Sequence, residues 1–421
     1  MQQKKSLTWR ILTGLTLGAI TGLAMSYFLA PDGTADLWIS GLFDLVGGLF
    51  INSIRMLVVP LVFVSLFCGV TSLGDIARVG RIGGKTLAFY LITTAIAISL
   101  ALAVSVLVQP GQGLNLAELS KHEPSMASRQ SMFKTLQNII PSNPIAAMAE
   151  GNMLQIIFVA LLSGVSATLV GARARPIIDF CESANAIVMN MVMLLMQLAP
   201  YGVFALIAKT FAAVGFDAML PLLKYVLTVL AVLLLHMCLT YMGALRLLGG
   251  LHPFRFFKNF LPAMSVGFST ASSNGTLPIS IETVETRCGV ASSIAAFTMP
   301  LGATINMDGT AIMQGVAVVF IAQVYGIALP LDSFLIVILT ATLASIGTAG
   351  VPGVGLITLS MVLESVNLPV EGIALIIGVD RLLDMTRTVV NISGDAVCTI
   401  LIAKSEGKFD AGIYDAENAR E

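Results

Sequence analysis

Residues 378–396, GVDRLLDMTRTVVNISGDA, decide how this chain folds, because they place charges inside its last long apolar segment, residues 372–403. The polar residues recur at helical spacing, so they share one face, about 100° wide, of a single helix. They are Asp380, Asp384, Arg387, Thr388, Asn391 and Asp395. The opposite face is apolar, which indicates that the helix turns its polar stripe away from lipid.

The polar stripe needs a reason to exist inside a membrane. A charge that faces lipid costs about 2.5–3.5 kcal/mol on insertion scales, so the stripe has to face protein or trapped water. A structural ion pair between Asp384 and Arg387, joining two helices, is the simpler interpretation. One such pair accounts for only two of the six polar side chains. We therefore interpret the stripe as a binding site.

The composition is that of a helical membrane protein, since 56% of the 421 residues are hydrophobic and only 11% are charged. The net charge of −1 gives no indication of nucleic-acid binding. Five cysteines lie in or beside apolar segments without paired spacing, so neither a zinc site nor a disulfide framework is predicted. The basic start and apolar run of residues 1–30 are interpreted as a retained first helix.

Six apolar segments precede residue 250 and are long enough to cross a bilayer. They are residues 9–30, 41–74, 86–108, 141–171, 180–213 and 219–248. Lys and Arg gather in alternate connections, so the positive-inside rule places both termini in the cytoplasm. The predicted location is the cell inner (plasma) membrane, with multiple passes and lipid as a partner.

Two later apolar segments are interrupted by residues that break helices. Residues 253–287 are broken at 269–276, and residues 331–366 are broken at 345–355, both rich in Gly, Ser and Thr. Irregular backbone at membrane depth is tolerated where it lines a cavity or is buried in protein. Each break alone could be a linker between ordinary loops. Together, each followed by a helix with polar residues, they predict two re-entrant hairpins in an inverted repeat, which is typical of secondary transporters.

The stripe offers the groups that an acidic amino acid requires. Arg387 presents a planar fork suited to a carboxylate, and Asp384, one turn earlier, can receive an ammonium group. The helix starts at the two breaks can hold a second carboxylate. Asn306, Asp308 and Asp395 add oxygen ligands beyond what this substrate needs, which favours a hard cation such as sodium.

Four motifs, SSNGTLP (272–278), GATINMDGT (302–310), ASIGTAGVPG (344–353) and VDRLLDMTRTVVNISGDA (379–396), resemble the dicarboxylate/amino acid:cation symporters, the glutamate-transporter homologues. The resemblance extends over essentially the whole chain. It implies an all-α polytopic fold with eight transmembrane helices and two re-entrant hairpins, assembled as a homotrimer. It further implies an elevator motion of a transport domain against a fixed scaffold, with the second hairpin as gate.

The resemblance also implies domain boundaries and site residues. Residues 1–80 and 130–213 would form the scaffold. Residues 81–129, which include an external loop, and residues 214–421 would form the transport domain. Substrate-binding positions would be Ser272, Ser273, Thr310, Val351, Gly355, Asp384, Arg387, Thr388 and Asn391. Co-transported sodium ions would use Tyr90, Thr93, Thr94, Gly302, Thr304, Asn306, Asp308, Ser345, Ile346, Thr348, Asn391 and Asp395.

Three departures from relatives refine the prediction. Asp384 and Asp395 are both present, unlike in the C4-dicarboxylate branch, which favours an amino acid and sodium. Gln314 stands where animal glutamate transporters carry a glutamate linked to protons, which disfavours proton coupling. Ala271 replaces an arginine beside the first break, and Arg381 instead lies next to Asp380, so transport rate is left open.

The choice between aspartate and glutamate, the number of sodium ions and an anion conductance also stay open. A proton-coupled glutamate or C4-dicarboxylate symporter is the nearest alternative. An intramembrane aspartyl protease is a remote one, because the first glycine of its Gly-x-Gly-Asp signature is missing at Ile392. A plain ion channel would not need an Arg/Asp pair shaped for an amino acid. We expect no enzymatic activity.

Overall fold

The computed structural model describes residues 7–28, 39–72, 76–114, 139–214, 219–346, 348, 350 and 352–416. Its α-helices are α1 (Leu7–Phe28), α3 (Asp44–Ser72), α4 (Ile76–Val108), α6 (Pro144–Glu150), α7 (Met153–Val170), α8 (Arg175–Met196), α9 (Ala199–Val214), α10 (Met219–His236), α11 (Met242–Leu247), α12 (Pro253–Thr270), α13 (Ser273–Thr286), α14 (Ser292–Ile305), α15 (Asp308–Val324), α16 (Leu331–Ser345), α17 (Val354–Ser365), α18 (Ile373–Ser405) and α19 (Ala411–Asp415). Short 3-10 or π segments are η2 (Ile39–Phe43), η3 (Gly171–Ala174), η5 (Met237–Tyr241) and η6 (Val370–Gly372). Within the described residues the only β pairing is an isolated bridge between Val290 and Phe409.

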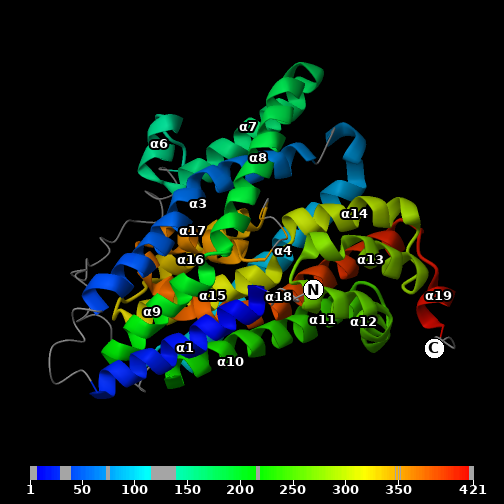
Figure 1. Ribbon diagram of the computed structural model, residues 1–421. Coiled ribbons are helices and arrows are strands. Elements are labelled where there is room, and N and C mark those ends of the chain that lie inside the picture. The colour runs from blue at the N-terminus through cyan, green and yellow to red at the C-terminus, as the bar shows by residue number, and fades with distance from the viewer. Residues whose placement is uncertain are drawn as a thin grey trace, which may run out of the picture.

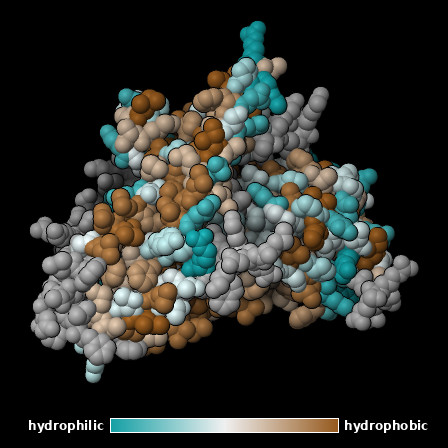
Figure 2. Space-filling model, in the orientation of Figure 1, coloured by the Kyte–Doolittle hydropathy of each residue, from teal (hydrophilic) through white to brown (hydrophobic). Residues whose placement is uncertain are grey.

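The architecture is that of a polytopic helical membrane protein, as predicted. Five described segments are long and apolar enough to cross a membrane, by length and composition: Gly41–Thr71, Arg81–Val108, Gln155–Met196, Met219–Leu247 and Ser292–Val324. Three shorter helical segments are also apolar: Ala199–Ala212, Leu331–Ser345 and Val354–Ser365. Figure 2 shows hydrophilic residues concentrated over the ends of α12, α13 and α19 and at the tip formed by α7 and α8.

The helices pack in two groups (Figure 1). In the first body, α1 packs on α9, and α3 packs on α7, α8 and α9. In the second body, α15 and α18 lie at the centre, surrounded by α4, α10, α12, α14, α16 and α17. The two bodies meet where α18 contacts α1 and α9, and where α17 contacts α3.

Glycines let α1 and α9 approach closely. A Cβ atom on Gly14 would lie 2.4 Å from the carbonyl oxygen of Pro200, and one on Gly22 would lie 2.4 Å from that of Ala208. Small residues at one-turn spacing allow such backbone contact between membrane helices. The first body is therefore held together by a close helix pair.

The two interrupted segments form helix pairs whose tips touch. Helix α12 ends at Ala271, which adopts a left-handed conformation with φ of 51°. Ser272 then caps α13, because its Oγ atom accepts the N–H of Gly275 at 3.0 Å. Gly350, between α16 and α17, accepts hydrogen bonds from Ser272 Oγ at 2.7 Å and from the N–H of Asn274 at 3.1 Å. The two breaks, far apart in the sequence, thus meet in the fold.

Helix boundaries differ from the predicted apolar segments where charge or a turn intervenes. Helix α4 begins at Ile76 rather than at residue 86, because hydropathy detects apolar surface and misses a charged helical start. The segment predicted at 141–171 consists of α6 and α7, separated at Gly151, which has φ of 70°. The segment at 180–213 consists of α8 and α9. Most of the predicted external loop, residues 115–138, lies outside the described residues.

Candidate substrate and cation site

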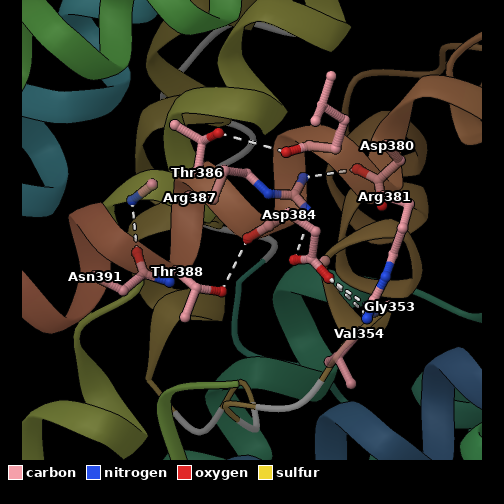
Figure 3. A network of polar contacts seen from close by, with 12 residues as sticks. Gly353, Val354, Asp380, Arg381, Asp384, Thr386, Arg387, Thr388 and Asn391 are labelled. Atoms are coloured by element: carbon pink, nitrogen blue, oxygen red, sulfur yellow. Dashed lines mark hydrogen bonds and ion pairs between the residues drawn. The ribbon is translucent and has the colours of Figure 1, made fainter. Parts of the chain in front are cut away.

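The charged stripe of α18 is centred on Arg387, whose side chain is completely buried (Figure 3). Its Nη1 atom lies 2.8 Å from Asp380 Oδ1, and its Nη2 atom donates to Asp384 Oδ1, also at 2.8 Å. The Asp384–Arg387 ion pair considered from the sequence is therefore present, but both residues belong to α18, so this pair does not join two helices. Among the described residues, the Nε and Nη1 donors of the guanidinium have no hydrogen-bond partner, although Nη1 is ion-paired with Asp380.

Asp384 connects the stripe to the tip between α16 and α17. Its Oδ2 atom accepts the N–H of Gly353 at 3.3 Å and lies 3.8 Å from Arg381 Nη1 (Figure 3). A cavity of about 200 Å³ adjoins Gly353 and is lined by residues of both bodies, including Ile11 and Met196. The hairpin tip thus lies between the charged stripe and the first body.

Gly355 leaves room beside the guanidinium. A Cβ atom on Gly355 would lie 3.3 Å from Arg387 Nη2 and 3.3 Å from Thr310 Cγ2. Thr388 is buried one turn after Asp384 and donates to the carbonyl of Asp384 at 2.8 Å. The structure therefore places Thr310, Gly355 and Thr388 around the Asp384–Arg387 pair. Val351 lies outside the described residues.

Asn391 joins α18 to the start of α15. Its Oδ1 atom accepts the N–H of Gly309 at 2.7 Å, and its Nδ2 atom lies 3.3 Å from the sulfur of Met307. Ser272 and Ser273 belong to the first hairpin tip, where Ser273 is buried against Gly350. These residues lie along the line where the two tips meet the broken helix α14–α15.

A second polar cluster surrounds Asp308, which is fully buried at the first position of α15. Thr94 donates to its Oδ1 atom at 2.5 Å, and Tyr241 donates to its Oδ2 atom at 2.8 Å. The ring Nε2 atom of His236 lies 3.1 Å from the same Oδ2 atom. Helices α4, α10 and α15 and the η5 segment thus converge on one carboxylate.

Asp395 lies about one helical turn after Asn391 on α18. Asn306 Nδ2 donates to its Oδ1 atom at 2.9 Å and to the carbonyl of Asn391 at 3.3 Å. The Oδ1 atom of Asn306 is buried without a hydrogen-bond partner in the part of the chain that the structure describes. An unpaired buried oxygen fits a cation site, because a bound cation would supply the partner that this oxygen lacks.

The other predicted cation ligands are placed as follows. Tyr90 donates to the carbonyl of Thr298 at 3.1 Å, and Thr93 donates to that of Tyr90 at 3.2 Å. Ser345 donates to the carbonyl of Ile305 and accepts the N–H of Met307 at 3.3 Å, so it reaches the α14–α15 break.

Three more of these residues hydrogen-bond locally. Thr304 bonds to Pro300, Ile346 to Leu343 and Thr348 to Ala344. Gly302 packs against Asp395, because a Cβ atom there would lie 2.4 Å from its Oδ1 atom.

Sequence reasoning missed three residues of these clusters. His236 and Tyr241 were assigned only to an apolar span, and Asp380 was assigned to the stripe without a role. The available signal was an ionisable residue within a membrane-length apolar run, which is itself an indication of function. The periodicity of one helix does not reveal which other helix faces it.

Buried carboxylates outnumber buried cationic groups. Among the described residues, four aspartates are buried, whereas Arg387 is the one buried arginine. The aspartates are Asp308, Asp380, Asp384 and Asp395. Uncompensated buried charge is strongly unfavourable. The site therefore requires additional positive charge, from cations or protons, to be stable.

Two broken helical units that meet over a buried charged site define the class of secondary transporters. The chain matches the sodium:dicarboxylate symporter family over residues 7–405 and belongs to this family. It is 38% identical over 417 residues to the proton/glutamate-aspartate symporter of Escherichia coli (strain K12), covering 97% of this chain and 94% of that protein.

The names of two further relatives specify a different substrate or coupling ion. The proton/sodium-glutamate symport protein of Geobacillus stearothermophilus is 34% identical over 415 residues, covering 97% of this chain and 96% of that protein. The C4-dicarboxylate transport protein of Bacillus subtilis (strain 168) is 30% identical over 416 residues, covering 97% of this chain and 96% of that protein. The chain is therefore a symporter and not an enzyme, which removes the protease alternative.

Proposed function

We propose that this protein is a sodium-coupled symporter of an acidic amino acid, L-aspartate or L-glutamate or both, with the sodium ions as co-transported substrates. The observation that carries this proposal is the buried Arg387, which pairs with Asp384 and keeps an unused Nε donor. An acidic amino acid can exchange partners with this pair. Its side-chain carboxylate replaces Asp384 on Arg387, and its ammonium takes the released carboxylate of Asp384.

The exchange involves the tip between α16 and α17. The N–H of Gly353 donates to Asp384, so an ammonium group that takes this carboxylate also releases the tip. Thr310, Gly355 and Thr388 surround the pair and complete the proposed substrate site, with Ser272, Ser273, Val351 and Asn391 at its edge. The α-carboxylate would be held by backbone N–H groups where the hairpin tips meet.

Cation coupling is supported by charge. The buried aspartates already exceed the buried arginine, and an acidic substrate adds a further net negative charge. Asp395 with Asn306, and Asp308 with Thr94, offer oxygen ligands for sodium next to the substrate site. Substrate and sodium would thus each lower the cost of binding the other.

The relative position of the two bodies supports an elevator mechanism. With both termini in the cytoplasm, Phe28 and Ile373 mark the outer ends of α1 and α18. Gly378 lies roughly 8 Å from the outer end of α18, but it packs against Leu15, which lies roughly 20 Å from the outer end of α1. The outer end of α18 therefore lies deeper than the outer end of α1. In Figure 1, α12, α13 and α14 extend beyond the N-terminal end of α1. The second body is the proposed transport domain, displaced toward the cytoplasm.

The first body is the proposed scaffold and the site of trimer assembly. Only 22% of the most apolar window of Gln155–Met196 is buried within the chain, against 100% for Ser292–Val324 in the second body. Helices α7 and α8 therefore offer apolar surface to lipid or to other copies of the chain, whereas α14 and α15 are enclosed. We assign the trimer contacts to α7 and α8.

A proton-coupled symporter of glutamate or a C4-dicarboxylate is the second candidate. It is favoured by the full set of contacts that Asp308 already has, with Thr94, Tyr241 and His236, which a sodium ion would have to rearrange. The name of the Escherichia coli relative also specifies protons.

Uptake of labelled aspartate, glutamate and succinate into proteoliposomes decides between the candidates. We expect an inward sodium gradient to drive accumulation of an amino acid at symmetric pH, with succinate taken up poorly. Robust uptake in sodium-free buffer under an imposed pH gradient would establish the second candidate instead.

A further inference from the structure

An ion pair joins the two bodies far from the substrate site. Arg55, on α3 of the first body, donates from Nη2 to Glu371 Oε1 at 2.9 Å. Glu371 lies in η6, immediately before α18 of the second body. Glu364, at the end of α17, also interacts electrostatically with Arg55. Arg55 thus faces two acidic residues at the outer end of the second body.

The depth of this contact indicates that it is specific to the displaced state. Helix α3 continues from Arg55 to Asp44 for roughly 16 Å toward the outer surface. Glu371, however, marks the outer end of α18. If the second body moved outward until its end was level with that of α3, Glu371 would leave Arg55 by more than the reach of either side chain.

We propose that Arg55 is a positioning residue, which pairs with Glu371 and thereby stabilises the inward-displaced position of the transport domain. This inference rests on the proposed elevator mechanism and adds a residue pair that sets the balance between its two end states. Because both side chains are partly exposed, at 36% and 52%, the pair contributes modestly. A modest contribution suits a contact that must break in every transport cycle.

The test is a distance measurement between the bodies in the full-length protein. Leu45 on α3 and Leu331 on α16 are both exposed and can carry spin labels after substitution by cysteine. The background lacks the five native cysteines and is first shown to retain uptake in proteoliposomes. Pulsed electron paramagnetic resonance in lipid nanodiscs then gives the ratio of displaced to outward populations.

We expect Arg55→Glu and Glu371→Arg each to lower this ratio by roughly two- to fivefold. The swapped double variant, Arg55→Glu with Glu371→Arg, should restore it. Arg55→Gln and Glu371→Gln provide the same comparison without introducing like charges. An unchanged ratio in the single variants, or a swap that does not restore the ratio, overturns the role of Arg55.

The matched control is the ion pair between Lys209 and Asp44, which has similar exposure but lies within the first body. Reversing its charges should leave the ratio unchanged. A parent protein that shows one distance under all conditions contradicts the moving-domain mechanism itself. Two distances whose ratio is insensitive to Arg55 contradict only the positioning role, so the two failures are distinguishable.

Discussion

Asp384 contacts Arg387 through one carboxylate oxygen and the backbone N–H of Gly353 through the other. A single side chain therefore joins the charged stripe of α18 to the tip of the α16–α17 hairpin. In the proposed mechanism, the substrate replaces both contacts at once. Substrate binding and movement of the hairpin tip are then coupled by one residue.

Asp384→Ala is expected to abolish binding of every amino acid, acidic or neutral, because all of them carry the ammonium group that Asp384 is proposed to bind. The loss of one partner of a buried charge pair costs about 2–5 kcal/mol. Isothermal titration of the purified variant with aspartate and serine measures the effect. Retained serine binding at near-parental affinity would show that the ammonium is held elsewhere.

Asp308→Asn is expected to weaken the dependence of substrate binding on sodium, because it removes a charged ligand from one proposed cation site. The measurement is the sodium concentration that gives half-maximal aspartate binding, which should rise in the variant. Asp332→Asn, at the start of α16 and away from both clusters, serves as the control. An unchanged sodium dependence would remove Asp308 from the cation site.

Helix α18 was predictable because its polar residues recur at helical spacing, and it runs from Ile373 to Ser405 against the predicted 372–403. The two hairpin breaks were predictable from Gly and Ser clusters within apolar runs. The contact between their tips, through Ser272 and Gly350, could not be predicted from local sequence, because the two residues are 78 positions apart.

Partners across helices were harder to predict. Periodicity places Asp308 on a helix but does not show that His236, 72 residues away, contacts it. The proposed displacement of the two bodies could not be predicted either, because a transporter that alternates between two arrangements has one sequence for both. Arg55 and Glu371 belong to this unpredictable class, since only their three-dimensional position makes them a pair.

Glu406 fastens the end of α18 to the start of α4 through hydrogen bonds from Lys85 at 2.7 Å and Arg81 at 2.5 Å. These bonds lower the pKa of Glu406 below its ordinary value of 4.5. The contact therefore adds stability above the unfolded-state pKa and loses it as pH falls through the lowered folded-state pKa.

We expect the C-terminal segment to become sensitive to proteolysis as pH falls through the lowered pKa of Glu406, which lies below 4.5. A Glu406→Gln variant should show this sensitivity already at neutral pH. The measurement is digestion with an acid-tolerant protease, with mass spectrometry to detect cleavage after residue 405. Equal protection of parent and variant across the pH range would exclude a stabilising role for the contact.

Gly302→Ala is expected to destabilise the protein by about 1–3 kcal/mol, because the added Cβ would overpack a filled site. It would lie 2.4 Å from Asp395 Oδ1 and 2.6 Å from the hydroxyl of Tyr90. Thermal unfolding in detergent measures the change in Tm. Gly84→Ala on α4, whose Cβ would meet no atom within 4 Å, is the control and should be neutral or stabilising.

Arg387→Thr is expected to change which substrate binds best. The variant loses the group that is proposed to bind the side-chain carboxylate, at a cost of about 2–5 kcal/mol. This corresponds to a loss of roughly 30-fold to several-thousand-fold in affinity for aspartate or glutamate. Serine and alanine lack that carboxylate, so their binding through the α-carboxylate and the ammonium should be retained or improve.

The competing interpretation of Arg387 is purely structural, since it pairs with both Asp380 and Asp384. Its loss would then remove the Arg387 contact from two buried carboxylates and impair folding without altering the order of substrates. Titration of the folded Arg387→Thr variant with aspartate and serine separates the two interpretations, and Arg387→Lys tests whether charge alone suffices. If the folded variant still prefers aspartate to serine as the parent does, Arg387 does not read the side chain and the acidic substrate assignment is wrong.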